Sequence, residues 1–299
     1  MPHTHGHHDH TRHHGGGHIG AAFFLNLSFT VVELVGGLFT NSVAILSDAA
    51  HDFGDSLSLG LAWYFQKRAR KGSNKQYPYG YTRVSLLGAI INAVVLSVGS
   101  VYILTEAVPR IFTPQETNAG GMFLLAVIGI LVNGAAALRT RKGASVNEKV
   151  VSLHLLEDVL GWAAVLVGSA VIHFTGLTVI DPILSVVIAV FVLTNVFRNI
   201  RQVLPILLQG TPAELDREEI AAKLTALRQV SALHDLHIWS LDEETVILTV
   251  HLVLAEVLPP DGLAALKGTV RALLAELGAE HATIEFETPG EDCTLASCI

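Results

Sequence analysis

The chain of 299 residues is 51% hydrophobic, only 15% charged, and has a formal net charge of −8. Soluble domains contain about 25% charged residues, so this composition indicates a membrane protein, and the acidic balance argues against nucleic-acid binding. The two cysteines, Cys293 and Cys298, lie at the end of the chain, where we expect free thiols or weak metal ligands rather than a structural disulfide.

Residues 1–18 are predicted to be a disordered tail. The segment combines glycines with eight histidines and offers no apolar residues to a core. Its histidines are His3, His5, His7, His8, His10, His13, His14 and His18. This composition suggests loose capture of metal ions, and the alternative is an extension that the function does not need.

Six apolar stretches follow, and together they predict a transmembrane domain over residues 19–208. They cover about 19–39, 43–65, 84–111, 120–138, 150–173 and 179–204. Each is close to or longer than the roughly 20 residues that cross a hydrocarbon core of about 30 Å. The first stretch is not followed by a convincing small-residue cleavage site, so we interpret it as a retained span rather than a signal peptide.

Lys and Arg residues are concentrated in the loops after the second, fourth and sixth stretches. The opposite loops contain little positive charge besides Arg110. Because cytoplasmic loops are enriched in Lys and Arg, this pattern predicts a multi-pass membrane protein with both termini in the cytoplasm.

The second and fifth stretches each contain a His-x-x-x-Asp pattern, from His51 to Asp55 and from His154 to Asp158. Residues four apart lie on one face of an α-helix, so each pattern presents an imidazole and a carboxylate side by side. Two such helices brought together would supply four nitrogen and oxygen ligands, a set that suits Zn²⁺. Ionisable groups within a bilayer are costly and mark transport pathways, so we predict a metal transport site here.

Other polar residues in these helices predict a hydrated cavity around the site. Those nearest to the pattern, or grouped on one helix face, are Asn26, Glu33, Asp48, Asp52 and Glu157. We interpret Asp48, Asp52 and Glu157 as hydrogen-bond partners of the ligands, with proton acceptance as the alternative for Asp52 and Glu157. Asn26 and Glu33 share a face of the first helix and are assigned to the same polar path, with simple helix-to-helix hydrogen bonding as the alternative for Asn26.

Residues 209–299 are predicted to form a small α+β domain. Helices are expected over 213–228 and 261–277, the first of them beginning after Thr211-Pro212. Strands are expected over 232–240, 245–254 and 282–287, with a turn at Asp242-Glu243-Glu244 between the first two. The chain therefore divides into a tail, a membrane domain and a C-terminal domain.

Several phrases of the sequence resemble the cation diffusion facilitator family, and more narrowly its zinc-transporting branch of bacterial zinc efflux proteins and vertebrate zinc transporters. They are "AILSDAAHDFGDSLSLGLAW", "YPYGYTRVSLLGAIINA", "SLHLLEDVLGWAAVLVG", "IDPILSVVIA", "LLQGTP" and "LHDLHIWSL". The resemblance extends from about residue 18 to 288. It implies an α-helical membrane protein, a six-transmembrane-helix bundle with a cytoplasmic ferredoxin-like domain, which acts as a homodimer in the lipid bilayer of a bacterial inner membrane and exports Zn²⁺ from the cytoplasm.

The resemblance also implies which residues bind metal. By motif, each subunit holds one Zn²⁺ through His51, Asp55, His154 and Asp158, and His at the first of these positions usually accompanies a preference for Zn²⁺ over Cd²⁺. The family's cytoplasmic domain often binds further zinc, and the candidate ligands here are His234, His251, His281, Glu285 and Glu287, with Cys293 and Cys298 as additions. Arg83 stands where relatives have a basic residue that forms an ion pair near the junction with this domain, but the partner position holds Gln209 instead of an acidic residue.

A transport mechanism follows from competition between metal and protons. A ligand must lose its proton before it binds a metal, and the ordinary pKa of His, about 6.5, lies within the physiological range. We therefore predict alternating access with exchange of Zn²⁺ for protons. The alternatives are a proton-independent divalent metal channel and a membrane-bound metal sensor. No enzyme activity is predicted, because the His-Glu-x-x-His pattern of a metallohydrolase is missing.

Overall fold

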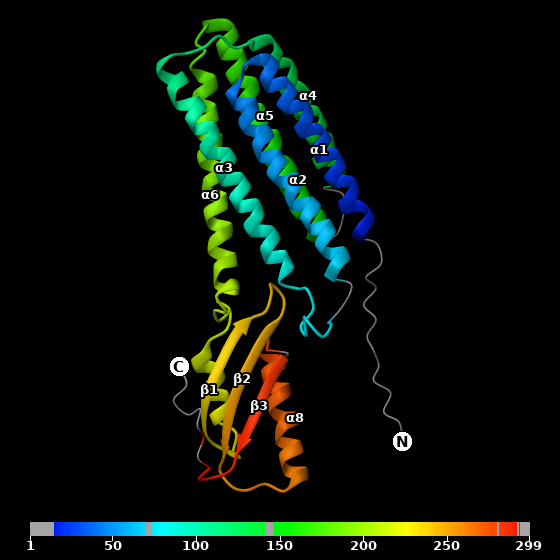
Figure 1. The fold of residues 1–299 in the computed structure, drawn as a ribbon, viewed down its shortest axis with the longest axis vertical. Coiled ribbons are helices and arrows are strands. Elements are labelled where there is room, and N and C mark those ends of the chain that lie inside the picture. Colours follow the sequence, from blue (N-terminus) through cyan, green and yellow to red (C-terminus); the bar gives the residue numbers. More distant parts are fainter. Residues whose placement is uncertain (1–14, 70–72, 141–145, 280, 292, 294–299) are drawn as a thin grey trace. The chain divides into compact units, whose positions relative to one another are not determined.

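The computed structural model describes residues 15–69, 73–140, 146–279, 281–291 and 293 (Figure 1). These residues form two compact units. The helical unit comprises the described residues of 1–71 and 88–199, and the C-terminal unit comprises those of 72–87 and 200–299. Residues 1–14 of the histidine-rich tail, which include His3 to His14, lie outside the described residues, and so does Cys298. Residues 15–18, which were predicted to be disordered, instead form the start of the first helix.

The helical unit is built from long helices whose apolar composition explains their length. In chain order they are α1 (Gly15–Thr40), α2 (Val43–Ala69), α3 (Val84–Phe112), α4 (Ala119–Thr140), α5 (Val146–Thr175) and α6 (Ile180–Leu207). Within the described residues, all of them except α2 are long and apolar enough to cross a membrane. The second helix has the length but carries three aspartates, so its passage through the membrane rests on the sequence argument.

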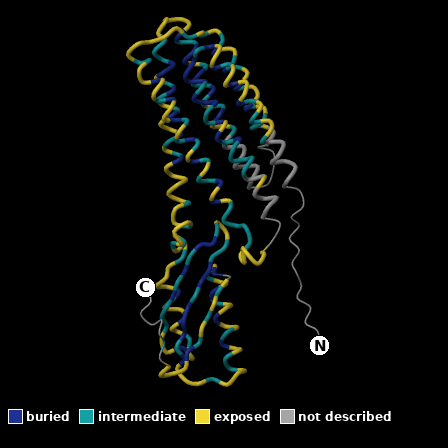
Figure 2. Tube along the Cα trace, viewed as in Figure 1, coloured by how far each residue is buried: buried dark blue, intermediate teal, exposed yellow. Residues whose placement is uncertain are grey.

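Helices α1, α2, α4 and α5 pack together around a core of side chains that includes Ile45, Met122 and Trp162. Figure 2 marks the buried stretches of the chain in dark blue. The helices approach closely where a glycine faces a bulky partner. A Cβ atom added at Gly129 of α4 would lie 2.3 Å from the Trp162 ring of α5. Helices α3 and α6 share a second set of apolar contacts, among which Leu96 packs with Val192 and Val196. Many outward-facing residues of the helical unit are large and apolar, as expected for a surface in contact with lipid.

The turn between α1 and α2 is held by polar contacts from other helices. Asn41 adopts a left-handed conformation, with φ of 53°, and Arg110 of α3 donates hydrogen bonds to its backbone and side-chain oxygens. Asp181, the second residue of α6, is fully buried and accepts hydrogen bonds from the Ser42 hydroxyl at 2.5 Å and the Val43 amide at 2.8 Å. The first turn of α2 is therefore capped by a carboxylate from α6.

The C-terminal unit is an α+β domain, as predicted. Its elements are α7 (Arg217–Thr225), β1 (Val230–Ser240), β2 (Val246–Leu254), α8 (Pro260–Glu276) and β3 (His281–Glu287). The sheet has the order β1-β2-β3, with β1 and β2 antiparallel and β2 and β3 parallel, as the α8 crossover requires. One face of this sheet and the two helices enclose a core that includes Leu248, Leu252 and Leu274. This arrangement, together with the helical unit, confirms the predicted fold class.

The first helix of this unit begins later than the sequence suggested. It starts at Arg217, and Asp216 is its N-cap residue, whose side chain accepts hydrogen bonds from the amides of Glu218 and Glu219. Thr211 instead donates its hydroxyl to the carbonyl of Ile238 in β1. A threonine before a proline is compatible with a helix start, but here the aspartate offers the stronger cap.

The segment before α3 belongs to the C-terminal unit and packs on its sheet. Arg83 donates from Nε to the carbonyl of Leu241 at 3.1 Å, and its guanidinium lies 5.2 Å from the ring centroid of Trp239. Tyr79 packs edge-on against His281, with 5.6 Å between ring centroids. Arg83 thus has a carbonyl and an indole as partners, and Gln209 stands where relatives have an acidic residue.

Candidate metal sites

The membrane site is built on the facing sides of α2 and α5. His51 and Asp55 lie one helical turn apart, with 3.6 Å between Nε2 and Oδ2, and both side chains are about one fifth exposed, at 19% and 21%. Asp158 is buried on α5. His154 lies in α5, but its side chain is outside the described residues. The structure therefore describes three of the four predicted ligands.

Helices α2 and α5 meet at this site. A Cβ atom added at Gly161 of α5 would lie 3.6 Å from Oδ1 of Asp48, so the glycine brings the α5 backbone close to α2. Asp48 and Asp52 are each close enough to interact electrostatically with both Asp55 and Asp158. The two His-x-x-x-Asp helices thus come together, which the spacing of the sequence alone could not establish.

Further carboxylates surround the predicted ligands. Glu33 of α1 is fully buried and interacts electrostatically with Asp48, Asp52 and Asp158. Buried carboxylates that interact electrostatically repel one another unless a cation or protons neutralise them. The cluster therefore suits alternate occupation by a divalent cation and by protons.

The remaining polar residues of the predicted path have different surroundings. Asn26 of α1 donates to the carbonyl of Asp52 and to the Ser56 hydroxyl, both at 3.0 Å, and so links α1 to α2 beside the site. Glu157 of α5 is exposed within the helical unit. Asn26 therefore holds α1 and α2 together beside the site. The Glu157 side chain lies instead at the surface of the helical unit.

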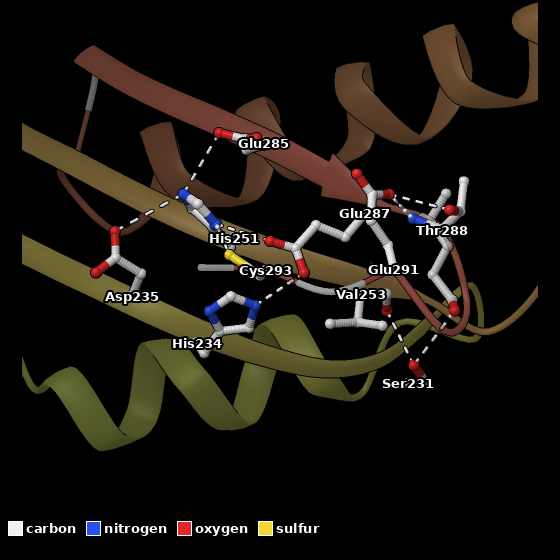
Figure 3. Close-up of polar contacts among 11 residues, drawn as sticks. Ser231, His234, Asp235, His251, Val253, Glu285, Glu287, Thr288, Glu291 and Cys293 are labelled. Carbon is white, nitrogen blue, oxygen red and sulfur yellow. Dashed lines mark hydrogen bonds and ion pairs between the residues drawn. The ribbon is translucent and has the colours of Figure 1, made fainter. Parts of the chain in front are cut away.

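A second group of candidate ligands lies on the C-terminal sheet (Figure 3). Glu287 bridges two histidines, with 2.9 Å from Oε2 to Nε2 of His234 and 2.8 Å from Oε1 to Nδ1 of His251. The Cys293 sulfur lies 3.6 Å from the same Nδ1 atom. One ligand atom from each of these four residues lies within 4.8 Å of all the others.

The register of the sheet explains how these residues meet. His234 of β1 is directly opposite His251 of β2, and His251 is opposite Glu285 of β3. Side chains opposite one another share a face of the sheet, and Glu287, two residues after Glu285, lies on that same face. Cys293 then joins them from the chain that follows β3.

The four residues fit a zinc ion in both chemistry and position. Two imidazole nitrogens, a carboxylate oxygen and a thiolate are ligands that Zn²⁺ accepts in tetrahedral sites. Zinc–ligand bonds of about 2.0–2.3 Å place tetrahedral ligands roughly 3.3–3.8 Å apart, so small movements would complete such a site.

The surroundings of Glu287 favour its ionised form, which can bind a cation. Burial acts to raise its pKa, but hydrogen bonds from His234, Cys293 and His251 and the charge of His234 outweigh this effect and hold the pKa below its ordinary value. The carboxylate is therefore ionised over the whole physiological range.

The other predicted ligands of this unit are placed differently. Glu285 is exposed and approaches the opposite edge of His251, with 3.4 Å between Oε2 and Nε2. His281 is exposed at the start of β3 and contacts Tyr79 rather than the four-residue group. Asp235, which sequence reasoning did not consider, lies 3.7 Å from His251 through Oδ2. Its only signal in the sequence is its place between His234 and His237.

Comparisons with known proteins agree with this architecture. Residues 19–208 match the family model described as the cation efflux transmembrane domain, and residues 212–289 match the cytoplasmic domain of cation efflux proteins. The chain is 33% identical to the metal cation efflux system protein CzcD of Cupriavidus metallidurans, over 93% of this chain and 89% of that protein. It is also 33% identical to the zinc transporter ZitB of Pectobacterium atrosepticum, over 94% and 88%. A cadmium, cobalt and zinc/H⁺-K⁺ antiporter of Bacillus subtilis is 31% identical, over 89% and 87%.

Proposed function

The chain belongs to the cation efflux family, the cation diffusion facilitators, and on this premise we propose that it is a carrier that exports Zn²⁺ from the cytoplasm in exchange for protons. The observation that carries the proposal is the meeting of α2 and α5, which brings the His51–Asp55 pair into the same carboxylate cluster as Asp158. The names of the relatives support both the ion and its exchange for protons.

The transported ion is assigned to His51, Asp55, His154 and Asp158. Two nitrogens and two carboxylate oxygens form a compact set that suits Zn²⁺ better than larger or harder cations. Other divalent cations, such as Cd²⁺ and Co²⁺, are further substrates to test, because a relative is named for them.

Protons replace the ion in the return step. When Zn²⁺ leaves, the buried carboxylates can remain close together only if protons neutralise part of their charge. Asp48, Asp52 and Glu33 are the buried acids that interact with the ligand Asp158, so we assign the exchanged protons to this group. Asn26 fixes the α2 backbone beside them, and the exposed Glu157 is a proton entry point.

The C-terminal unit is proposed to bind a second, retained zinc ion. His234, His251, Glu287 and Cys293 would hold it, and the ion would link the three strands of the sheet to the chain that follows. Cys298 is an additional candidate ligand, and the histidine-rich tail would capture zinc near the cytoplasmic entrance. In this proposal the protein is a homodimer in a bacterial inner membrane, with both termini in the cytoplasm.

Two other functions are compatible with one or the other of these two metal sites. The four-residue group of the C-terminal unit would suit a membrane-bound metal sensor, which has no need of a transport site between α2 and α5. A channel would conduct zinc without proton exchange.

Transport by reconstituted vesicles separates these functions. The proposal expects zinc flux that responds to an imposed pH gradient and is abolished by Asp55→Ala and by Asp158→Ala. Glu276→Gln, an exposed change on α8, is the matched control and should transport normally. Flux that is indifferent to the gradient would point to a channel, and its persistence in both aspartate variants would refute the transport site. His51→Asp should admit Cd²⁺ more readily, because the family resemblance associates His at this position with a preference for Zn²⁺ over Cd²⁺.

A further inference from the structure

His251 presents its two ring nitrogens to two different groups of residues (Figure 3). The Nδ1 atom faces Glu287 and Cys293, at 2.8 Å and 3.6 Å. The Nε2 atom faces two other carboxylates, Glu285 at 3.4 Å and Asp235 at 3.7 Å. The second pair lies outside the four-residue group, so the ring stands between a set of metal ligands on one edge and two anions on the other.

Asp235 reaches this position through an irregularity of β1. In a regular strand it would point to the opposite face from its neighbour His234. A β-bulge between His234 and His237 breaks this alternation, and Asp235 has a φ of 50°, which is uncommon for a residue other than glycine. Backbone strain of this kind persists where the surrounding structure requires it, and it is concentrated at functional sites.

A contact with His237 holds the carboxylate of Asp235 in its position beside His251. Its Oδ1 atom lies 2.8 Å from Nε2 of His237, and its side chain is only 13% exposed. Glu285 is 65% exposed and reaches the ring from β3. His251 therefore has one largely buried anion and one exposed anion beside Nε2.

The two anions suit the tautomer of His251 that a metal at Nδ1 requires. A neutral imidazole carries its single proton on one nitrogen, and the other nitrogen has the lone pair that can bind a metal. In the metal-free protein Nδ1 lies 2.8 Å from Oε1 of Glu287, close enough to donate a hydrogen bond to it. A metal at Nδ1 takes the place of any proton there, so the N–H of the ring must then lie at Nε2, beside the two carboxylates. Histidines that bind metals commonly donate their second N–H to a carboxylate, and this fixes both the ring orientation and the tautomer.

We propose that Asp235 and Glu285 are positioning residues that present Nδ1 of His251 to the metal of the C-terminal unit. The inference rests on the zinc site proposed above, and adds to it two residues that do not bind the ion themselves. Zinc that binds at Nδ1 displaces no proton from Nε2, so the contacts with both carboxylates persist in the bound state.

The test measures zinc affinity of the full chain by competition with a chelator of known affinity. Asp55→Ala and Asp158→Ala are introduced together to remove the transport site, and the eight tail histidines are replaced by Asn, so that this background keeps only the site of the C-terminal unit. In this background, Asp235→Asn and Glu285→Gln should each weaken zinc binding about 10-fold, and the double variant up to about 100-fold. Asn tolerates the left-handed conformation at position 235, and Glu285 is exposed, so neither change should lower the thermal unfolding midpoint of the metal-free protein. Glu276→Gln is the control and should bind zinc like the background.

A spectroscopic measurement separates positioning from a general effect of charge. With ¹⁵N-labelled histidine, the zinc-bound background should show His251 protonated at Nε2, with the resonance identified by its loss in His251→Asn. In the zinc-bound double variant, part of His251 should carry its proton at Nδ1 instead, because no carboxylate then holds the N–H at Nε2. Unchanged affinity in the double variant, or a His251 proton at Nδ1, would overturn the inference while leaving the zinc site in place. Absence of zinc binding in the background itself would instead refute the site.

Discussion

Asp181 stabilises the helical unit by completing the N-terminus of α2. The first amide groups of a helix have no partner within the helix. Here the amides of Val43 and Ala44 donate to the Asp181 carboxylate at 2.8 Å and 3.3 Å, and the amide of Ile45 donates to the Ser42 hydroxyl. The same hydroxyl donates to Asp181 at 2.5 Å. One carboxylate from α6 therefore supports all three amides, directly or through Ser42.

Asp181→Ala removes these contacts from a site that is 0% exposed. Each buried donor left without an acceptor costs about 1–3 kcal/mol. Three donors lose their acceptor here, namely the Ser42 hydroxyl and the amides of Val43 and Ala44. Relief from burying a charge offsets part of this cost, so we expect the free energy of unfolding to fall by about 2–4 kcal/mol. Asp181→Asn keeps one acceptor oxygen and should lose roughly half as much.

The assay is equilibrium unfolding of the full chain in mixed micelles, followed by circular dichroism. Glu116→Ala is the matched control, because this exposed carboxylate lies near the same turn and should leave the stability unchanged. A loss below about 0.5 kcal/mol for Asp181→Ala would show that the cap adds nothing to the stability of α2, and the reasoning would be wrong.

Three further predictions concern packing, pH and the C-terminal unit. Gly129→Ala places a Cβ atom 2.3 Å from the Trp162 ring and should cost about 1–3 kcal/mol in the same unfolding assay, whereas Gly134→Ala has 4.0 Å of space and should be neutral. Glu287→Gln should destabilise the metal-free C-terminal unit at neutral pH. Because the folded pKa of Glu287 is lowered, its stabilising effect is complete above the ordinary value of 4.5 and is lost as the pH falls through the lowered value, so chemical unfolding of variant and wild type should converge in acid. Arg83→Ala removes a hydrogen bond and an indole contact at 5.2 Å, and hydrogen exchange of β1 should quicken by a factor that corresponds to about 1 kcal/mol. Hydrogen exchange of β1 at the wild-type rate in Arg83→Ala would contradict this prediction.

Local periodicity accounts for what could be predicted without a structure. Hydrophobic length predicted the helices, and spacing by four placed His51 and Asp55 on one face, because both features depend only on the geometry of a single helix. His251 and Glu287, in contrast, were candidate ligands only through the resemblance to the family, because the period of a single strand does not show which strands pair. Charge in the loops predicted orientation, since each loop acts through its own composition.

Contacts between distant segments required the tertiary structure. The approach of Gly161 to Asp48 depends on how α5 packs against α2, and the cap on α2 comes from Asp181, 138 residues further along the chain than Val43. The bulge that turns Asp235 towards His251 is set by the pairing of β1 with β2, not by any local preference of the sequence around it. The sequence therefore determined which residues could bind metal and on which element they lie. Packing decided which of them meet, because side chains far apart in the chain are brought together only when the apolar faces of their elements are buried against one another.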